Sequence, residues 1–208
     1  MTTNEAQWED AQAGEAGYWG NCLGMRAWGE FVKQEMYGRE MGVFDDYGDS
    51  GGELDMRGKS VLDVGGGPVS MTLRCYNAHM LVVVDPINWP ASVYRRYRRH
   101  DISFVRAPGE ELPSGGLYDE VWIYNVLQHV QDPLKVLANA RQHIKEDGGV
   151  LRIFEWLWIP ADTCHPHVLT PELLLNGLLG LRVKKFGIPV CNDYWSNGAK
   201  AFVGVFTR

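Results

Sequence analysis

The stretch VLDVGGGPVS, residues 61–70, constrains this chain more than any other feature of its sequence. Branched and apolar residues around Asp63 predict a short buried strand. The run of three glycines at 65–67 then predicts a turn in which backbone N–H groups can approach a ligand closely, because no side chain intervenes. Pro68 cannot continue the strand. The stretch is therefore typical of a strand, a glycine turn and a helix built around a ligand.

The length, hydropathy, cysteine spacing and net charge of the chain limit the classes of protein to which it can belong. A chain of 208 residues is expected to form one domain, residues 1–208, with a sizeable core. No apolar run approaches the ~20 residues that span a bilayer, and the polar N-terminus does not resemble a secretory signal, so no membrane partner is expected. The four cysteines form no C-x-x-C pair, which favours reduced thiols and a cytoplasmic location. A net charge of -6 argues against a nucleic-acid platform.

Strand and helix signals alternate along most of the chain, which predicts an α/β fold. Residues 1–57 are expected to form a helical cap, which breaks near Gly20 and Gly24, and a loop. Residues 58–208 are expected to form a Rossmann-like core. The expected strands cover residues 61–64, 80–86, 103–106, 118–124, 150–155, 181–186 and 201–206. The expected helices cover 70–78, 91–99 and 132–144, and a last helix begins at Thr170 and Pro171. This alternation implies a parallel sheet covered on both faces, and the two last strands form a hairpin that adds an antiparallel strand.

The acidic residues that follow the first two strands indicate the ligand. Asp85 lies 22 residues after Asp63, a separation that suits a carboxylate accepting hydrogen bonds from the hydroxyls of a ribose. Asp85 could instead be a strand-end turn residue. A nicotinamide dinucleotide would require a G-x-G-x-x-G motif, of which this chain carries only a degraded form. The acid before the glycines would repel a pyrophosphate but could receive a cationic amine, which favours S-adenosylmethionine.

Five segments, in order, carry a resemblance to a known family: VLDVGGGP, VVVDP, FVRAPGEELP, the long run from YDEVWIYNVLQHVQDP to LRIFEW, and the final strand pair. With these segments the chain resembles a class I S-adenosylmethionine-dependent methyltransferase, nearest to the small group that includes the quinone-biosynthesis methyltransferases. The resemblance covers roughly residues 58–206. It implies a three-layer sandwich around a seven-stranded sheet in which only the last strand is antiparallel, and an enzyme that methylates a small molecule.

The resemblance also implies roles for single residues. Asp63 and the turn would hold the methionine moiety, Asp85 the ribose, and Asn125 would face the methyl group. Relatives often place an acid near the adenine, but Pro108 stands at that position, so backbone at the following residues is expected to recognise it. Val69 replaces the third glycine of the usual motif. The full set of expected cofactor contacts is Asp63, Gly65, Gly66, Gly67, Asp85, Pro86, Ile87, Gly109, Glu110, Asn125, Tyr18 and Trp19.

Histidines are the natural candidates for handling an acceptor proton, because the unperturbed pKa of histidine is ~6.5. His129 follows the fourth strand and could serve this purpose or simply order its loop. His165 and His167 follow the fifth strand, where substrate would enter, and could contact it or have a plain loop role. A zinc site that combines them with Cys164 is not expected, because the ligands are crowded and no second cluster exists.

Two further features leave alternatives open. Tyr18 and Trp19 could stabilise a sulfonium by cation–π attraction or belong to the core of the cap. The basic run YRRYRRH, residues 94–100, could meet phosphates or form a solvated helix face. The sequence therefore predicts an S-adenosylmethionine-dependent methyltransferase with a small-molecule acceptor, with a non-catalytic cofactor-binding protein or a nucleic-acid methyltransferase as alternatives.

Overall fold

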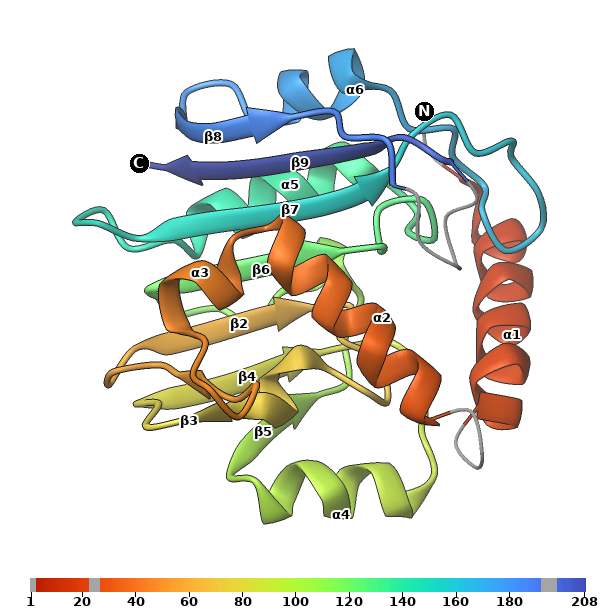
Figure 1. Ribbon diagram of the computed structural model, residues 1–208. Helices are drawn as coiled ribbons and strands as arrows, with labels where there is room; N and C mark the ends of the chain where they lie inside the picture. The colour runs from red at the N-terminus through yellow and green to blue at the C-terminus, as the bar shows by residue number, and fades with distance from the viewer. Residues whose placement is uncertain (1–2, 23–26, 192–197) are drawn as a thin grey trace.

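The computed structural model describes residues 3–22, 27–191 and 198–208, and its centre is a mixed sheet. Among these residues the sheet has seven strands in the order β5-β4-β2-β6-β7-β9-β8 (Figure 1). The strands are β2 (Ser60–Val64), β4 (Met80–Val84), β5 (Ile102–Val105), β6 (Glu120–Tyr124), β7 (Val150–Trp156), β8 (Arg182–Gly187) and β9 (Ala201–Thr207). The expected seven-stranded sheet is confirmed.

The sheet is parallel except at one strand. β2 pairs in parallel with both β4 and β6, so that Asp63 lies beside Val83 on one side and Trp122 on the other. β9 runs antiparallel to both β7 and β8, which confirms the predicted hairpin. From β2 the chain builds outward through β4 and β5, and then on the other side through β6 and β7. The strand order therefore reverses beside β2, where ligands bind in open α/β sheets.

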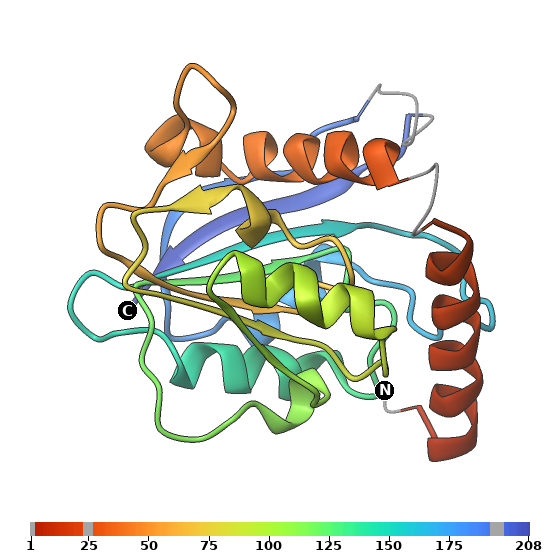
Figure 2. The same ribbon diagram turned by 90° about the horizontal axis from the view of Figure 1, so that it is seen from below.

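Helices cover both faces of the sheet and make three layers (Figures 1 and 2). One face carries α2 (Ala27–Glu40), α3 (Val43–Tyr47) and α4 (Ala91–Arg99), and the other carries α5 (Pro133–Gln142) and α6 (Pro171–Gly177). Successive side chains of a strand point to opposite faces. Val61 accordingly packs in the cluster that holds Tyr37 of α2, whereas Leu62 packs in the cluster that holds Val136 of α5.

The helix starts read from the sequence are confirmed. Asp132 caps α5, with Oδ1 accepting the backbone N–H groups of Leu134 at 3.0 Å and Lys135 at 3.2 Å. Thr170 caps α6 by accepting the N–H of Leu173 at 3.3 Å. In both helices proline follows the cap, where its missing N–H costs no hydrogen bond.

The expectation of a crossover helix over residues 70–78 is wrong. The segment holds a 3₁₀ turn, Met71–Arg74, followed by the strand β3 (Cys75–Tyr76), which pairs in parallel with β1 (Leu54–Asp55). The Ser70 hydroxyl accepts the N–H of Thr72, so the helical turn is capped at its start. The backbone pairing with β1 then favours an extended chain, so tertiary contacts override a segment of weak helix propensity.

The first helix, α1 (Glu5–Cys22), stands apart from both helix layers, beside the carboxyl ends of the parallel strands (Figures 1 and 2). It is tied there by Gln12, whose Nε2 donates to the carbonyl of His129 at 3.1 Å. The helix runs through Gly20, where a break was expected, whereas the expected break at Gly24 lies outside the described residues. Within the described ranges, no helix has the length and apolar character needed to cross a lipid bilayer.

Candidate functional site

A cavity of about 520 Å³ opens at the carboxyl ends of β2, β4 and β6, and α1 and α2 form its outer wall. Of the sequence-predicted site residues, the structure brings a large group together on its walls: Tyr18, Trp19, Gly65, Gly66, Gly67, Asp85, Pro86, Ile87, Gly109, Glu110, Asn125, His129 and His165. Asp63 and His167 do not line it. The cavity therefore joins segments that lie more than 140 residues apart in the chain.

The glycine turn requires glycine at two positions for different reasons. Gly65 has a φ of +75°, and a Cβ there would meet a methyl carbon of Val126 at 2.5 Å. Gly67 has a φ of +59°, and a Cβ there would meet nothing within 4 Å, because this position faces open space. Its backbone N–H donates to Oδ2 of Asp85 at 3.1 Å. A ligand can therefore approach the backbone at Gly67 more closely than any side chain would allow.

Asp85 is held rigidly at the end of β4. Its Oδ1 accepts the backbone N–H of Ile87 and the indole Nε1–H of Trp89, both at 3.0 Å. Only 6% of the residue is exposed, and this burial raises the pKa of Asp85 to about 7. A carboxylate offers about four acceptor positions, of which three are occupied here. Because Asp85 lines the cavity, its fourth acceptor position can serve a ligand that lies there.

Asp63 lies behind the turn rather than on the cavity wall. It is fully buried, and its Oδ2 accepts hydrogen bonds from the Ser70 hydroxyl at 2.5 Å and from the Tyr124 hydroxyl. Burial raises the pKa of Asp63 to about 7. The hydroxyl of Tyr97 supports the same turn by donating to the carbonyl of Gly67 at 2.6 Å. These contacts make Asp63 a support of the turn, and Asp63 is not among the residues that line the cavity.

Glu110 offers an acid near the position where the sequence places Pro108. Its Oε1 accepts the backbone N–H groups of Gln131 at 2.8 Å and Asp132 at 2.9 Å. Its Oε2 is buried and has no hydrogen-bond partner among the described residues. A buried acceptor without a partner is costly, so a ligand that brings a donor to this wall would be stabilised.

Asn125 and the residues after it shape the cavity at the end of β6. Asn125 has a φ of +56°, an uncommon conformation that asparagine tolerates better than most residues. Its Oδ1 accepts from Nε2 of Gln128 at 3.1 Å. The backbone that follows is fixed by Glu155, whose Oε1 accepts the N–H groups of Val126 and Leu127 at 3.0 Å. Burial raises the pKa of Glu155 to about 8.

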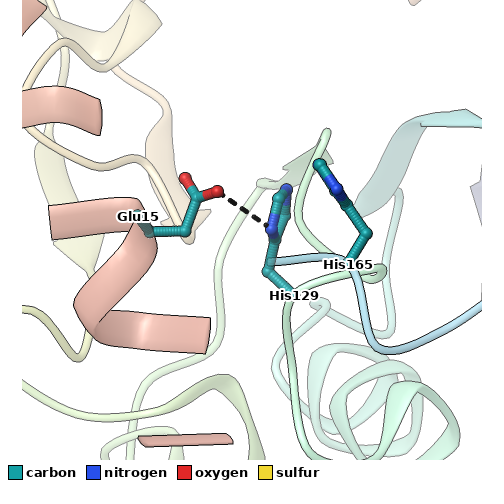
Figure 3. A group of neighbouring side chains, drawn as sticks. All are labelled: Glu15, His129 and His165. Carbon is teal, nitrogen blue, oxygen red and sulfur yellow. Dashed lines mark ion pairs between the residues drawn. The ribbon is translucent and has the colours of Figure 1, made fainter. Parts of the chain in front are cut away.

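His129 and His165 lie together with Glu15 of α1 at the outer end of the cavity (Figure 3). The two imidazole centroids are 4.6 Å apart, and Nδ1 of His129 lies 3.4 Å from Oε1 of Glu15 and 2.8 Å from the carbonyl of Cys164. Burial and the neighbouring His165 lower the pKa of His129 to about 4. Burial raises the pKa of Glu15. His129 is therefore a neutral ring at pH 7, and its contact with Glu15 is polar rather than ionic.

The side chain of His167 does not line the cavity. It is buried, and its Nε2 lies 2.7 Å from the carbonyl of Val130 and 3.0 Å from the hydroxyl of Thr3. It thus links the loop after β7 to the loop after β6 and to the start of the chain. The arginines of α4 are also away from the cavity, since no residue of that helix is among its described lining residues.

Several lining residues were missed by the sequence analysis. Glu15 was missed because α1 shows no clear amphipathic pattern to mark one side as functional. On α2, Glu30, Gln34 and Tyr37 line the cavity, and all three are buried. Their spacing of four and three residues puts them on one helix face. The available signal was that two polar residues, Glu30 and Gln34, share this helix face with Tyr37. Polar groups on a buried face call for a partner.

A comparison with protein families finds a match over residues 45–157, more than half of the chain, to the family described as "Methyltransferase domain". A curated protein, the ubiquinone biosynthesis O-methyltransferase of Rickettsia canadensis (strain McKiel), is 30% identical over 98 residues. That alignment covers 45% of this chain and 42% of the relative. The chain thus matches less than half of the length of this relative.

Solved structures share the architecture. The N-methyltransferase NodS from Bradyrhizobium japonicum WM9, in complex with S-adenosylhomocysteine, has a TM-score of 0.58 at 16% identity, over 84% of this chain and 85% of that one. A Burkholderia thailandensis 1,6-didemethyltoxoflavin-N1-methyltransferase, with 1,6-didemethyltoxoflavin and S-adenosylhomocysteine bound, has a TM-score of 0.70 at 14% identity. That match covers 100% of this chain and 92% of the other. At such identities the likeness shows a shared fold.

Proposed function

Because the chain belongs to the methyltransferase-domain family, we propose that it transfers a methyl group from S-adenosylmethionine to a small-molecule acceptor. The observation that carries this proposal is Asp85, a buried carboxylate on the cavity wall whose orientation is fixed beside the glycine turn. A carboxylate at the end of the second parallel strand is placed to accept hydrogen bonds from ribose hydroxyls. The two relatives of known structure described above hold S-adenosylhomocysteine, which supports the same choice of cofactor.

Different residues of the cavity bind different parts of this cofactor. Asp85 accepts hydrogen bonds from the ribose, and the open backbone at Gly67 receives the methionine portion. Pro86 and Ile87 on one side, and Gly109 on the other, enclose the adenine. The partnerless Oε2 of Glu110 provides an acceptor for an adenine N–H donor, in addition to the backbone contacts expected from the sequence. Asp63 acts indirectly, by holding the turn in place through Ser70 and Tyr124.

The acceptor occupies the outer end of the cavity. S-Adenosylmethionine, when bound, supplies an electrophilic methyl group: as the acceptor atom bonds to carbon, the C–S bond breaks and its electron pair stays on the sulfur of S-adenosylhomocysteine. Asn125, Tyr18 and Trp19 also line the cavity and enclose the reacting groups, which favours an in-line approach. His129 and His165 contact the acceptor, whereas His167 serves as a positioning residue for the loop.

The proposal extends to the cellular setting, which we take to be the cytoplasm. The thiols of Cys75 and Cys164 are free in the structure, which supports a reducing compartment. The exposed arginines of α4 lie outside the cavity, so the acceptor is a small molecule rather than a nucleic acid.

The experiment that tests this function is calorimetric titration of the purified protein with S-adenosylmethionine, S-adenosylhomocysteine and NAD. We expect both adenosyl ligands to bind and NAD not to bind. Asp85→Ala should weaken the binding of S-adenosylhomocysteine at least tenfold, about 1.4 kcal/mol. Asp147→Ala, at an exposed turn between α5 and β7, is the matched control and should bind as the parent does. Failure of both adenosyl ligands to bind the folded parent protein would overturn the proposal.

A further inference from the structure

Three side chains from distant parts of the chain converge at the outer end of the cavity. Glu15, His129 and His165 each offer one ligand atom, and these atoms all lie within 4.8 Å of one another. Figure 3 shows Glu15 projecting from α1 toward the two rings, with His129 between Glu15 and His165. The side chains of Glu15 and His129 are 18% and 13% exposed, and that of His165 is 28% exposed. The group is therefore shielded from bulk water yet reachable from the cavity.

In each imidazole a protein oxygen holds one ring nitrogen. Nδ1 of His165 lies 2.9 Å from Oδ1 of Asp162, and that oxygen also accepts the backbone N–H of His165 at 2.7 Å. Nε2 of His165 is consequently the nitrogen left for a ligand. Nδ1 of His129, which also lies 3.4 Å from Oε1 of Glu15, donates to the carbonyl of Cys164 at 2.8 Å, so Nε2 is the nitrogen of His129 that is left for a ligand. Metal-binding histidines almost always carry such a carboxylate or carbonyl partner on the other ring nitrogen, which fixes the ring and its tautomer.

A second, independent observation indicates a missing ligand at the same place. Gln128 is 3% exposed and lines the cavity next to His129, with its Nε2 3.3 Å from Nε2 of that histidine. The Oε1 of Gln128 is buried and has no hydrogen-bond partner in the described structure. An amide oxygen left without a donor in this way is unfavourable. A hydrated ion bound by the neighbouring histidines would bring water donors to it.

From these contacts we propose that Glu15, His129 and His165 bind one divalent metal ion at the acceptor end of the cavity. The ion is Zn²⁺ or a first-row transition-metal ion with similar ligand preferences. Two imidazoles and a carboxylate are the protein ligands of open, catalytic zinc sites, in which a water or substrate fills the remaining position. With Zn²⁺ bonds of about 2.1 Å, tetrahedral ligand atoms stand about 3.4 Å apart. The three side chains would therefore close by about an ångström around the ion.

This site would define the acceptor class, a point that rests on the proposed methyltransferase function. An open position on the ion favours an acceptor that presents an oxygen donor, such as a hydroxyl group, and a bound cation makes that hydroxyl easier to deprotonate. The proton would pass to water. The site differs from the combination of Cys164, His165 and His167 weighed from the sequence, because His167 is turned toward Val130.

The test is direct metal binding by the protein of 208 residues without cofactor. After treatment with a chelator, the protein is titrated with Zn²⁺ by calorimetry and with Co²⁺ by visible absorption, which reports the coordination geometry. We expect one equivalent of metal ion to bind. The visible absorption bands of Co²⁺ should be those of an ion bound by histidine. Glu15→Gln and His165→Ala should each weaken Zn²⁺ binding at least tenfold. His100→Ala, at an exposed histidine far from the cavity, and Cys164→Ser should bind Zn²⁺ as the parent does.

The outcomes separate this proposal from the proposed function. Each protein is also titrated with S-adenosylhomocysteine, which reports folding and the cofactor site independently of the metal. Absence of stoichiometric Zn²⁺ binding, or equal binding by the Glu15→Gln variant, in protein that still binds S-adenosylhomocysteine would overturn the metal site alone. Zn²⁺ binding that depends on Glu15 and His165, in protein that binds no adenosyl ligand, would support the site and overturn the proposed function.

Discussion

The indole Nε1–H of Trp89 donates to Oδ1 of Asp85 at 3.0 Å, four residues earlier in the chain. Trp89 is 4% exposed and packs in the core on the α2 side of the sheet, so its ring cannot move independently of that core. The backbone N–H of Ile87 donates to the same oxygen. The carboxylate proposed to bind the ribose is thus pre-oriented by a buried side chain.

Trp89→Phe should weaken cofactor binding without unfolding the protein. Phenylalanine keeps most of the packing but removes the hydrogen bond to Asp85, and one such bond contributes about 1 kcal/mol. We expect the affinity for S-adenosylhomocysteine to fall roughly fivefold by calorimetry. Trp158→Phe, at a tryptophan that is 47% exposed, should leave the affinity unchanged. Equal affinities of the parent and the Trp89→Phe variant would show that Asp85 needs no such orientation.

Gly67→Ala should impair cofactor binding more than it impairs folding. Both Gly67 and Gly58 have a positive φ, +59° and +77°, and at both positions an added Cβ meets nothing within 4 Å. The backbone cost of alanine, about 1 kcal/mol, should therefore be similar for the two variants. Only Gly67 lines the cavity, so only there would the new methyl group occupy space proposed for the cofactor.

The two glycine variants are compared by chemical denaturation and by titration with S-adenosylhomocysteine. We expect similar losses of unfolding free energy, together with a loss of affinity of at least tenfold for Gly67→Ala alone. If Gly58→Ala lost as much affinity as Gly67→Ala, the effect would come from general destabilisation and not from a filled cofactor site.

Cofactor affinity should rise with pH between about 6 and 8. Burial raises the pKa of Asp85 to about 7 in the free protein. A carboxylate that accepts ribose hydroxyls is best ionised, so binding below the pKa must first remove a proton. Each pH unit below the pKa costs up to tenfold, about 1.4 kcal/mol. The negative charge of Glu15 also raises the pKa of Asp85, and the charge of Asp85 in turn raises the pKa of Asp63.

Calorimetry with S-adenosylhomocysteine at several pH values checks this dependence. We expect the affinity to increase by about fivefold from pH 6 to pH 7 and by about tenfold from pH 6 to pH 8, and to level off above pH 8. Asp85→Asn should bind more weakly but with a flatter profile, since asparagine does not titrate. A parent profile that is flat, or one that persists in the asparagine variant, would contradict the assignment to Asp85.

Arg152→Met should destabilise the fold strongly. Arg152 is 2% exposed, and its guanidinium contacts Oε2 of the fully buried Glu120 at 2.7 Å and the carbonyl of Met41 at 2.9 Å. Removing the arginine leaves Glu120 with an unpaired buried charge, which typically costs about 3–5 kcal/mol. Denaturant unfolding measures the loss. The double variant Arg152→Met with Glu120→Gln should be less destabilised than the single variant, and a greater loss in the double variant would contradict this account.

Much of the architecture followed from the sequence, because its signals are local. Pro133 after Asp132 and Pro171 after Thr170 mark helix starts through the chemistry of a few adjacent atoms, and the structure confirms both. The alternation of strand and helix patterns predicted a parallel sheet, and the missing helix before residue 201 predicted the antiparallel β9. The prediction of a helix over residues 70–78 failed because the conformation of this segment depends on pairing with β1, which lies more than 15 residues earlier in the chain.

The sequence by itself determined the glycine turn, the strands that flank it and the acid that follows the second strand, since these depend on backbone sterics and on spacing along the chain. Only the tertiary structure decided which polar side chains meet. It turned Asp63 and His167 away from the cavity and brought Glu15 of α1 to His129 and His165. The reason is physical: α1 has little pattern of its own, and its position is fixed by contacts with loops more than 100 residues away.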